Sequence, residues 1–173
     1  MKRSISFLFV IAALALAVPT FAQQVAGPFD LPVTATVIEN CTVTTTAVDF
    51  GNYDPIVANA TTPAGDKSEA TAGTITVTCT KGSNGLRVDL NNGTADPNPR
   101  RMTGPGADIL NYDLYQEATH ATRWGTGAAN GVALGVFSAA NPSYALSVYG
   151  ILPGGQNVVT GAYSDTVQVT VNR

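Results

Sequence analysis

The most informative stretch of this chain is residues 29–37, which read FDLPVTATV. Apolar and polar residues alternate through this whole stretch, which we call the N-terminal stretch. Successive side chains of a β-strand point to opposite faces, so the alternation predicts a strand with one complete apolar face. That face would consist of Phe29, Leu31, Val33, Ala35 and Val37. Such a strand has to bury its apolar face, either in its own domain or in a neighbouring molecule.

The residues before this stretch have the composition of a secretory signal. Lys2 and Arg3 precede an unbroken apolar run over residues 7–18, and Ala22 ends a small-residue cleavage site. A retained membrane anchor is the alternative, but the run is short for a bilayer span. We therefore expect residues 1–22 to be a signal peptide and the mature chain to have no stable membrane insertion.

Length and charge restrict the class of protein. The remaining 23–173 are enough for one domain with a proper core, and they carry seven basic residues against twelve acidic ones, a net charge of about −5. The absence of a basic patch argues against binding to nucleic acid. Charged residues make up only 12% of the chain, which indicates a surface that neighbouring molecules cover or that small polar side chains solvate.

The chain has two cysteines, Cys41 and Cys79. In an exported protein such a pair usually forms a disulfide, for which the chain-entropy model gives roughly 4 kcal/mol of stabilisation. A metal site is the alternative, but no second pair of ligands stands nearby and the single histidine is His120. We expect a disulfide, and neither a metal nor a cofactor.

Short strand-like runs separated by Gly, Pro and Asn follow the N-terminal stretch, and no helical periodicity is sustained. The expected strands begin at Cys41 and then cover 73–80, 86–90, 110–115, 144–149 and 166–171. This pattern predicts an all-β fold, a β-sandwich of about six antiparallel strands. A seven-stranded sandwich would require one more strand after 166–171. We therefore expect two unpaired strand edges and an apolar groove that another chain can fill.

An ordered series of short motifs covers nearly the whole mature chain. It comprises CTV (41–43), FGNY (50–53), GTITVTC (73–79), RM (101–102), LNYDLY (110–115), WG (124–125), YG (149–150) and GAYSDTV (161–167). The series resembles the spore coat protein U family, which includes the Csu-type pilins of archaic chaperone–usher pili. The chain differs from this pattern at its end, where we would expect an aromatic residue in place of Val171-Asn172-Arg173.

The resemblance implies an incomplete immunoglobulin-like β-sandwich of the pilin type, with a domain over 41–173 and an N-terminal donor-strand extension over 23–40. In such pilins a periplasmic chaperone lends the missing strand, and an outer-membrane usher exchanges it for the N-terminal strand of the next subunit. The donor residues would be Phe29, Leu31, Val33, Ala35 and Val37. The implied product is a surface pilus of identical or homologous subunits, outside the cell, that supports adhesion and biofilm formation.

Three other functions are open at this point. One is a secreted spore-coat or matrix protein of the same fold. Another is a carbohydrate-binding tip adhesin, which we disfavour because such a subunit would carry a further domain and no donor strand. An enzyme is the least favoured, because no nucleophile–base pair emerges around His120, although Asp113 and Glu117 lie close to it in sequence.

Several other residues have a structural interpretation that we prefer. Asp96, Asn98 and Asp108 lack the alternation of a calcium loop, so we expect loop solvation. Trp124 and Tyr112 could belong to a sugar-binding surface but are better explained as core aromatics. The glycosylation sequons at Asn59 and Asn92 are three-residue matches that arise often by chance.

Overall fold

The computed structural model describes residues 27–94 and 99–173. The expected signal peptide and its cleavage site at Ala22 lie outside the described residues. The chain divides after Thr36, so residues 27–36 and the body, Val37–Arg173, are described separately.

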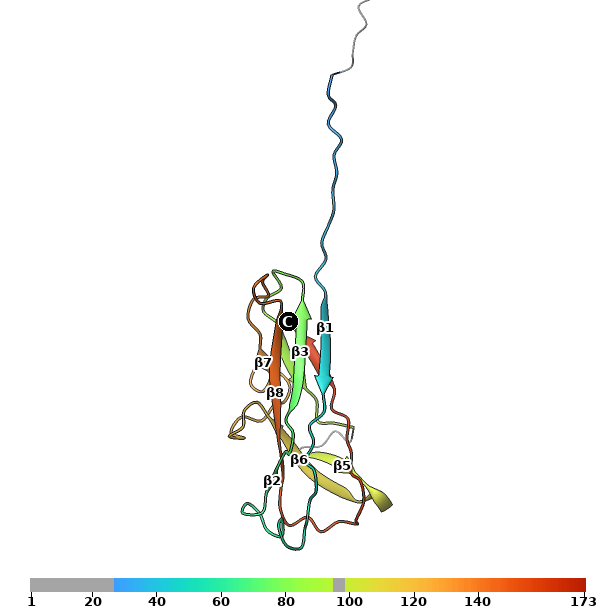
Figure 1. The fold of residues 1–173 in the computed structure, drawn as a ribbon, viewed down its shortest axis with the longest axis vertical. Helices are drawn as coiled ribbons and strands as arrows, with labels where there is room; N and C mark the ends of the chain where they lie inside the picture. The colour runs from blue at the N-terminus through green and yellow to red at the C-terminus, as the bar shows by residue number, and fades with distance from the viewer. Residues whose placement is uncertain (1–26, 95–98) are drawn as a thin grey trace, which may run out of the picture. The chain divides into compact units, whose positions relative to one another are not determined.

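The body consists of two antiparallel sheets (Figure 1). The larger sheet has the order β1-β3-β8-β6-β5, with β2 also paired to β8, and the smaller one has the order β7-β4-β9. The strands of the larger sheet are β1 (Cys41–Thr46), β2 (Lys67–Ser68), β3 (Gly73–Cys79), β5 (Arg100–Thr103), β6 (Ile109–Tyr115) and β8 (Ser143–Leu152). Those of the smaller sheet are β4 (Arg87–Leu90), β7 (Val132–Ala133) and β9 (Val169–Asn172). A short 3₁₀ turn, η1 (Pro105–Ala107), joins β5 to β6.

Alternation of side chains produces the central strands. In β3, the sequence GTITVTC places Ile75, Val77 and Cys79 in the interior while the threonines between them face outward. In β6, Leu110, Tyr112 and Leu114 are buried in the same way. Both strands have hydrogen-bonded neighbours on their two sides, which is why their predicted alternation becomes a regular strand.

The core lies between the two sheets. Its largest fully buried side chains include Trp124 and Phe137, and the Trp124 indole N–H donates to the carbonyl oxygen of Val88 at 3.0 Å. Tyr112 is also buried. The interpretation of Trp124 and Tyr112 as core aromatics is therefore confirmed.

A charged group is also part of the core. Arg100 is fully buried, and its Nη1 donates to the Asp113 carboxylate at 2.7 Å while its Nη2 donates to the Trp124 carbonyl at 2.7 Å. Asp113 is shared with Arg123, whose Nε donates to it at 2.6 Å. Burial, followed by the positive charge of Arg123, lowers the pKa of Arg100, whereas Asp113 acts in the opposite direction. The network joins β5, β6 and the segment after β6.

All six strand regions expected in the body contain a strand. β2, β5 and β7 were not expected, and β9 begins at Val169, three residues later than predicted. The N-terminal stretch is different, since no regular secondary structure forms between residues 27 and 40. An extended chain is a strand only when its backbone is paired, and this stretch has no paired backbone in the single molecule.

Candidate strand-accepting groove

Two of the terminal strands of the sheets, β1 and β9, lie beside each other and have a free edge each. Within residues 27–94 and 99–173, β1 pairs only with β3 and β9 pairs only with β4. The two edges run in opposite directions. Glu39, just before β1, is ion-paired with Arg173 at the end of β9, whereas Thr45 and Val167, at the end of β1 and just before β9, line one cavity. The body therefore has a gap between two antiparallel edges, which is the arrangement into which one further strand fits.

The side chains along this gap belong to the core but are incompletely covered. Val43 and Thr45 of β1 lie opposite the buried Val77 and Ile75 in β3, so they point inward. Val43 is nevertheless 38% exposed. On the other edge, Val169 and Val171 lie opposite the buried Leu90 and Val88 of β4 and are only half-buried. A strand between the two edges would cover these side chains.

A cavity of about 520 Å³ lies between the edges. Its lining is mostly apolar and includes Thr45, Val48, Phe50, Met102, Val167 and Val169. A second cavity of about 800 Å³ shares Val48, Phe50, Met102 and Tyr163 with the first, so the hollow continues beyond the end of β1. We call this hollow, together with the free edges of β1 and β9, the groove.

Asp165 contributes a carboxylate to the first of the two cavities. Burial alone would raise its pKa, but hydrogen bonds from the Thr94 N–H at 2.9 Å and from the Tyr112 hydroxyl at 2.8 Å contribute to holding the pKa below its usual value. Burial, and then the bond to Asp165, raise the pKa of Tyr112. Asp165 therefore stays ionised and bonded at neutral pH, and it fixes the segment that leads into β9.

The N-terminal stretch has an apolar face and a free backbone, which are what a strand needs to fill the groove. Its apolar side chains are largely exposed, with Phe29 at 84%, Leu31 at 85%, Val33 at 87% and Val37 at 83%, and Ala35 is exposed as well. Large exposed aliphatic and aromatic side chains at every second position are an unsatisfied strand face. The sequence predicted this face.

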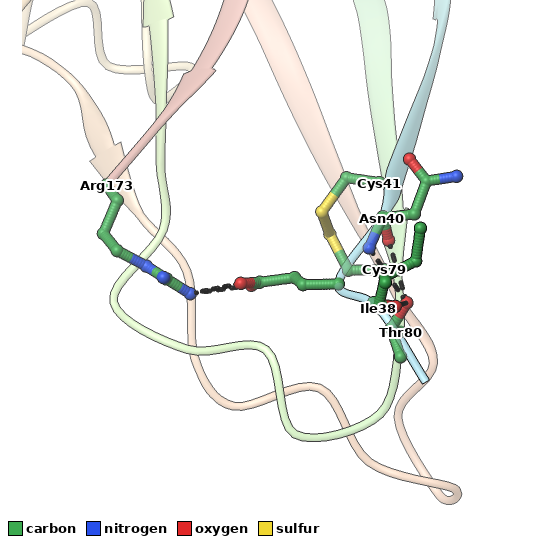
Figure 2. Close-up of a disulfide and its surroundings, with 7 residues drawn as sticks. Ile38, Asn40, Cys41, Cys79, Thr80 and Arg173 are labelled. Atoms are coloured by element: carbon green, nitrogen blue, oxygen red, sulfur yellow. Dashed lines mark hydrogen bonds and ion pairs between the residues drawn. A yellow bond between two sulfur atoms is a disulfide. The ribbon is translucent and has the colours of Figure 1, made fainter. Parts of the chain in front are cut away.

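The residues between this stretch and β1 are fixed to the body, as Figure 2 shows. Cys41 and Cys79 form a disulfide with an S–S distance of 2.04 Å. The Thr80 N–H donates to the Asn40 carbonyl at 2.9 Å, and the Asn40 N–H donates to the Thr80 hydroxyl at 3.0 Å. Arg173 donates to both carboxylate oxygens of Glu39 at 2.7 and 2.6 Å. No local sequence pattern indicates the contacts of Thr80 and Arg173, because they join residues far apart in the chain.

The other candidate residues are dispersed. His120 lies 3.3 Å from a carboxylate oxygen of Glu69 and packs edge-on against Tyr115. Asp113 binds Arg100 and Arg123, and Glu117 accepts from the Thr122 N–H. The side chains of these three residues therefore have separate partners, although the His120 N–H donates to the Glu117 carbonyl at 3.0 Å. Among the described residues, no cluster of three His, Cys, Asp or Glu side chains could hold a metal ion.

The remaining loop residues have structural partners or lie outside the described part. Asp108 accepts from the Val159 N–H at 2.7 Å, whereas Asp96 and Asn98 lie outside the described residues. Asn59 is buried, and its side-chain amide donates to the Gly65 carbonyl at 2.7 Å. The Asn92 side chain accepts from Arg123 at 2.9 Å.

Comparison with known proteins assigns the chain to a family. Residues 28–170 match the family described as the Spore Coat Protein U domain. The chain belongs to this family. The matched range contains the N-terminal stretch as well as nearly the whole body, so the spore coat protein U domain, as the family defines it, includes the segment that is unpaired here.

A relative of this spore coat protein U domain is Protein U of Myxococcus xanthus. It is 32% identical over 131 residues, which cover 72% of this chain and 70% of Protein U. The fold is similar to that of a chain in the crystal structure of the CsuC–CsuE chaperone–tip adhesion subunit pre-assembly complex, from archaic chaperone–usher Csu pili of Acinetobacter baumannii. The TM-score is 0.55 at 21% identity, and the match covers 80% of this chain and 41% of that chain.

These likenesses confirm two of the predictions, the family and the all-β sandwich of the pilin type. The name of neither relative describes a catalytic activity. None of the described helical segments has the length and apolar character that a membrane crossing requires.

Proposed function

We propose that this chain is a structural subunit of a surface pilus and that subunits join by strand addition, the N-terminal stretch of one molecule filling the groove of the next. The observation that carries the proposal is the match between an unpaired apolar strand face and a groove with two unpaired edges in the same chain. Main-chain hydrogen bonds to both edges would give affinity, and the alternate apolar side chains would give specificity.

The dimensions and the chemistry fit. Nine extended residues span roughly 30 Å at about 3.3 Å per residue. The edge of the groove from Cys41 to Val48 is of about the same length. Five apolar side chains would enter a hollow lined by Phe50, Met102 and Val169, while Asp30 and Thr34 would face outward. Burial of side chains of this size stabilises the contact by about 5–10 kcal/mol before the cost of ordering the stretch.

The contact is heterologous and does not close on itself. The N-terminal stretch is one surface and the groove is another, so each added molecule presents a new free surface, and the chain of molecules grows as a filament. Because the inserted strand would become part of the core of the next body, its release requires partial unfolding of that body. Kinetic stability of the filament follows.

The same features support assembly by a periplasmic chaperone and an outer-membrane usher. A groove with two free edges and exposed core side chains invites aggregation unless another protein covers it during export. The name of the similar structure describes a complex of a chaperone with a subunit of Csu pili, which supports this route. The finished pilus would lie on the cell surface and support adhesion and biofilm formation.

A coat or matrix role is the second candidate. The family description and the 32% identity to Protein U favour it. Such a protein could use the same strand addition without forming a long pilus. Chaperone and usher genes beside the gene for this chain would indicate a pilus, and their absence would favour the coat or matrix role.

Electrophoresis of the mature chain with and without boiling tests the proposal. Strand-exchanged polymers should resist detergent at room temperature and dissociate on heating. Deletion of residues 23–37 should abolish the polymers, and Thr34→Ser, a change on the outward face, should leave them intact. If the shortened chain still forms detergent-resistant polymers, the N-terminal stretch is not the connecting strand and the proposal is wrong.

A further inference from the structure

Pro32 lies in the middle of the N-terminal stretch and has no backbone N–H. A strand inserted between two edges would be a central strand, and proline is normally confined to edge strands. The backbone geometry of the groove explains how this proline can be accommodated. The explanation rests on the proposed function, because it applies to the inserted strand.

The backbone groups on the free edge of β1 belong to residues whose side chains point inward. Asn40 and Thr80 exchange the hydrogen bonds that start the β1–β3 ladder, with the Thr80 N–H donating to the Asn40 carbonyl. Bonded pairs alternate in an antiparallel ladder, so residues 42, 44 and 46 face β3. The N–H and C=O groups of Cys41, Val43 and Thr45 therefore face the groove, and these are the inward-pointing residues.

The same holds for the edge of β9. The Asn91 N–H donates to the Gln168 carbonyl at 3.1 Å, and the Gln168 N–H donates to the Asn91 side chain at 2.8 Å. Alternation from this pair turns residues 168, 170 and 172 toward β4. The free N–H and C=O groups are then those of Val167, Val169 and Val171, which are again the inward-pointing residues.

These two edges determine which residues of an inserted strand bind where. Because β1 and β9 run in opposite directions, the inserted strand is antiparallel to one edge and parallel to the other. In an antiparallel pair, bonded residues lie opposite each other and point to the same face, so the inward residues bind that edge. In a parallel pair, the backbone of a residue forms hydrogen bonds with the residues before and after the one opposite it. Since the free backbone groups of the edge belong to inward-pointing residues, their partners on the inserted strand are its outward-pointing residues. This holds for either direction of insertion.

Pro32 is an outward residue, between Leu31 and Val33 of the apolar face. We infer that Pro32 is a specificity-determining residue that places the missing N–H on the parallel ladder and leaves the antiparallel ladder uninterrupted. The parallel ladder is the slightly weaker one, so the gap falls where it costs least. The proline ring also fills the space of the missing hydrogen, which only the parallel edge has to accommodate.

The same residue limits wrong pairings of the free stretch. A stack of N-terminal stretches would need hydrogen bonds on both edges of every strand, and Pro32 interrupts one of them. Insertion into the groove tolerates that gap because the side chains of the stretch are held by the hollow. Pro32 therefore favours the groove over open-ended association between stretches.

Moving the proline along the full mature chain tests the inference. Pro32→Thr restores the N–H, and adding Thr34→Pro moves the gap along the same ladder, whereas adding Ala35→Pro moves it to the antiparallel ladder. Pro32→Thr with Ala35→Val is the matched control, because valine has as many side-chain carbons as proline and keeps the backbone N–H. These positions precede the body, whose own strands do not include them.

The measurement is the rate at which detergent-resistant polymers dissociate on heating. We expect Pro32→Thr polymers to dissociate more slowly than wild type, and those with Thr34→Pro to behave like wild type. Polymers with Ala35→Pro should dissociate about tenfold faster than the Ala35→Val control, or fail to form. Equal rates for the Thr34→Pro and Ala35→Pro variants would overturn the ladder assignment alone. Absence of polymers from the wild-type chain would overturn the proposed function and, with it, this inference.

Discussion

The N-terminal stretch and β3 have the same sequence pattern and different structures. Residues 29–37 alternate apolar and polar side chains as regularly as Gly73–Cys79 does. In β3, both edges are paired and Ile75, Val77 and Cys79 are buried, whereas Leu31 and Val33 are more than four-fifths exposed in a segment without regular structure. Alternation therefore specifies that a segment has an apolar face. Whether the segment forms a strand depends on whether a partner edge is available to it.

The largest effect on stability or assembly should come from placing a charge on the apolar face of β3 or on that of the N-terminal stretch. Val77→Asp buries an unpaired carboxylate between the sheets and should cost about 5 kcal/mol of unfolding free energy, enough to prevent folding. Leu31→Asp should change the unfolding free energy of the body by less than about 0.5 kcal/mol but abolish detergent-resistant polymers. Urea unfolding and unheated electrophoresis measure the two outcomes. A destabilised body in the Leu31→Asp variant would show that the stretch has a partner within its own molecule.

The next effect concerns how β1 is held, since β1 is itself an edge strand. Replacing Cys41 and Cys79 by alanine removes the disulfide between β1 and β3, and it should cost up to about 4 kcal/mol. Reduction of the wild-type chain should give the same loss, which serves as the control. A loss below about 1 kcal/mol would mean that backbone pairing alone holds the β1 edge of the groove.

A smaller effect is expected for the buried arginine. Arg100→Leu removes the partner of Asp113, which keeps Arg123, and leaves the carbonyl groups of Asn91 and Trp124 without their buried donor. We expect a loss of about 3 kcal/mol in urea unfolding. Arg173→Ala, which removes an exposed ion pair, is the matched control and should cost less than about 1 kcal/mol. Equal losses for the two variants would contradict a structural role of the Arg100 network.

The smallest effect is the pH dependence contributed by the groove. The pKa of Asp165 is lowered in the folded state, so its ionised form stabilises the body above about pH 4, and that contribution is lost as the pH falls through the folded-state pKa. Asp165→Asn should therefore make the decline of stability between pH 4 and pH 2 shallower. Tyr112→Phe removes one of the hydrogen bonds that lower this pKa and should do the same to a smaller extent. An unchanged pH profile in Asp165→Asn would contradict the assignment.

The sequence predicted the parts of the fold that depend on local alternation. β3, β4, β6 and β8 lie where apolar residues occupy every second position. β5 was missed because Arg100-Arg101-Met102-Thr103 has no alternation, and its first residue is a buried charge held by residues far along the chain. The strand expected at 166–171 begins late because its partner strand gives way to the turn at Asn91-Asn92-Gly93.

The groove was predicted in outline only. A sandwich one strand short implies two free edges, but their identity as β1 and β9 depends on the sheet order, which alternation does not encode. The contacts by which Thr80 and Arg173 hold residues 38–40 are equally non-local. The apolar face of the N-terminal stretch was read directly from the sequence, because it is a property of nine consecutive residues.

The central claim is that the N-terminal stretch of one molecule lies in the groove of another. Its most direct test mixes two single-cysteine additions to the mature chain, Val33→Cys in one molecule and Val167→Cys, Val169→Cys or Val171→Cys in the other, and maps the disulfides by mass spectrometry. The account predicts cross-links between Val33→Cys and the edge of β9 that join two molecules. Absence of cross-links from this mixture, together with an internal cross-link in a chain that carries both substitutions, would contradict it.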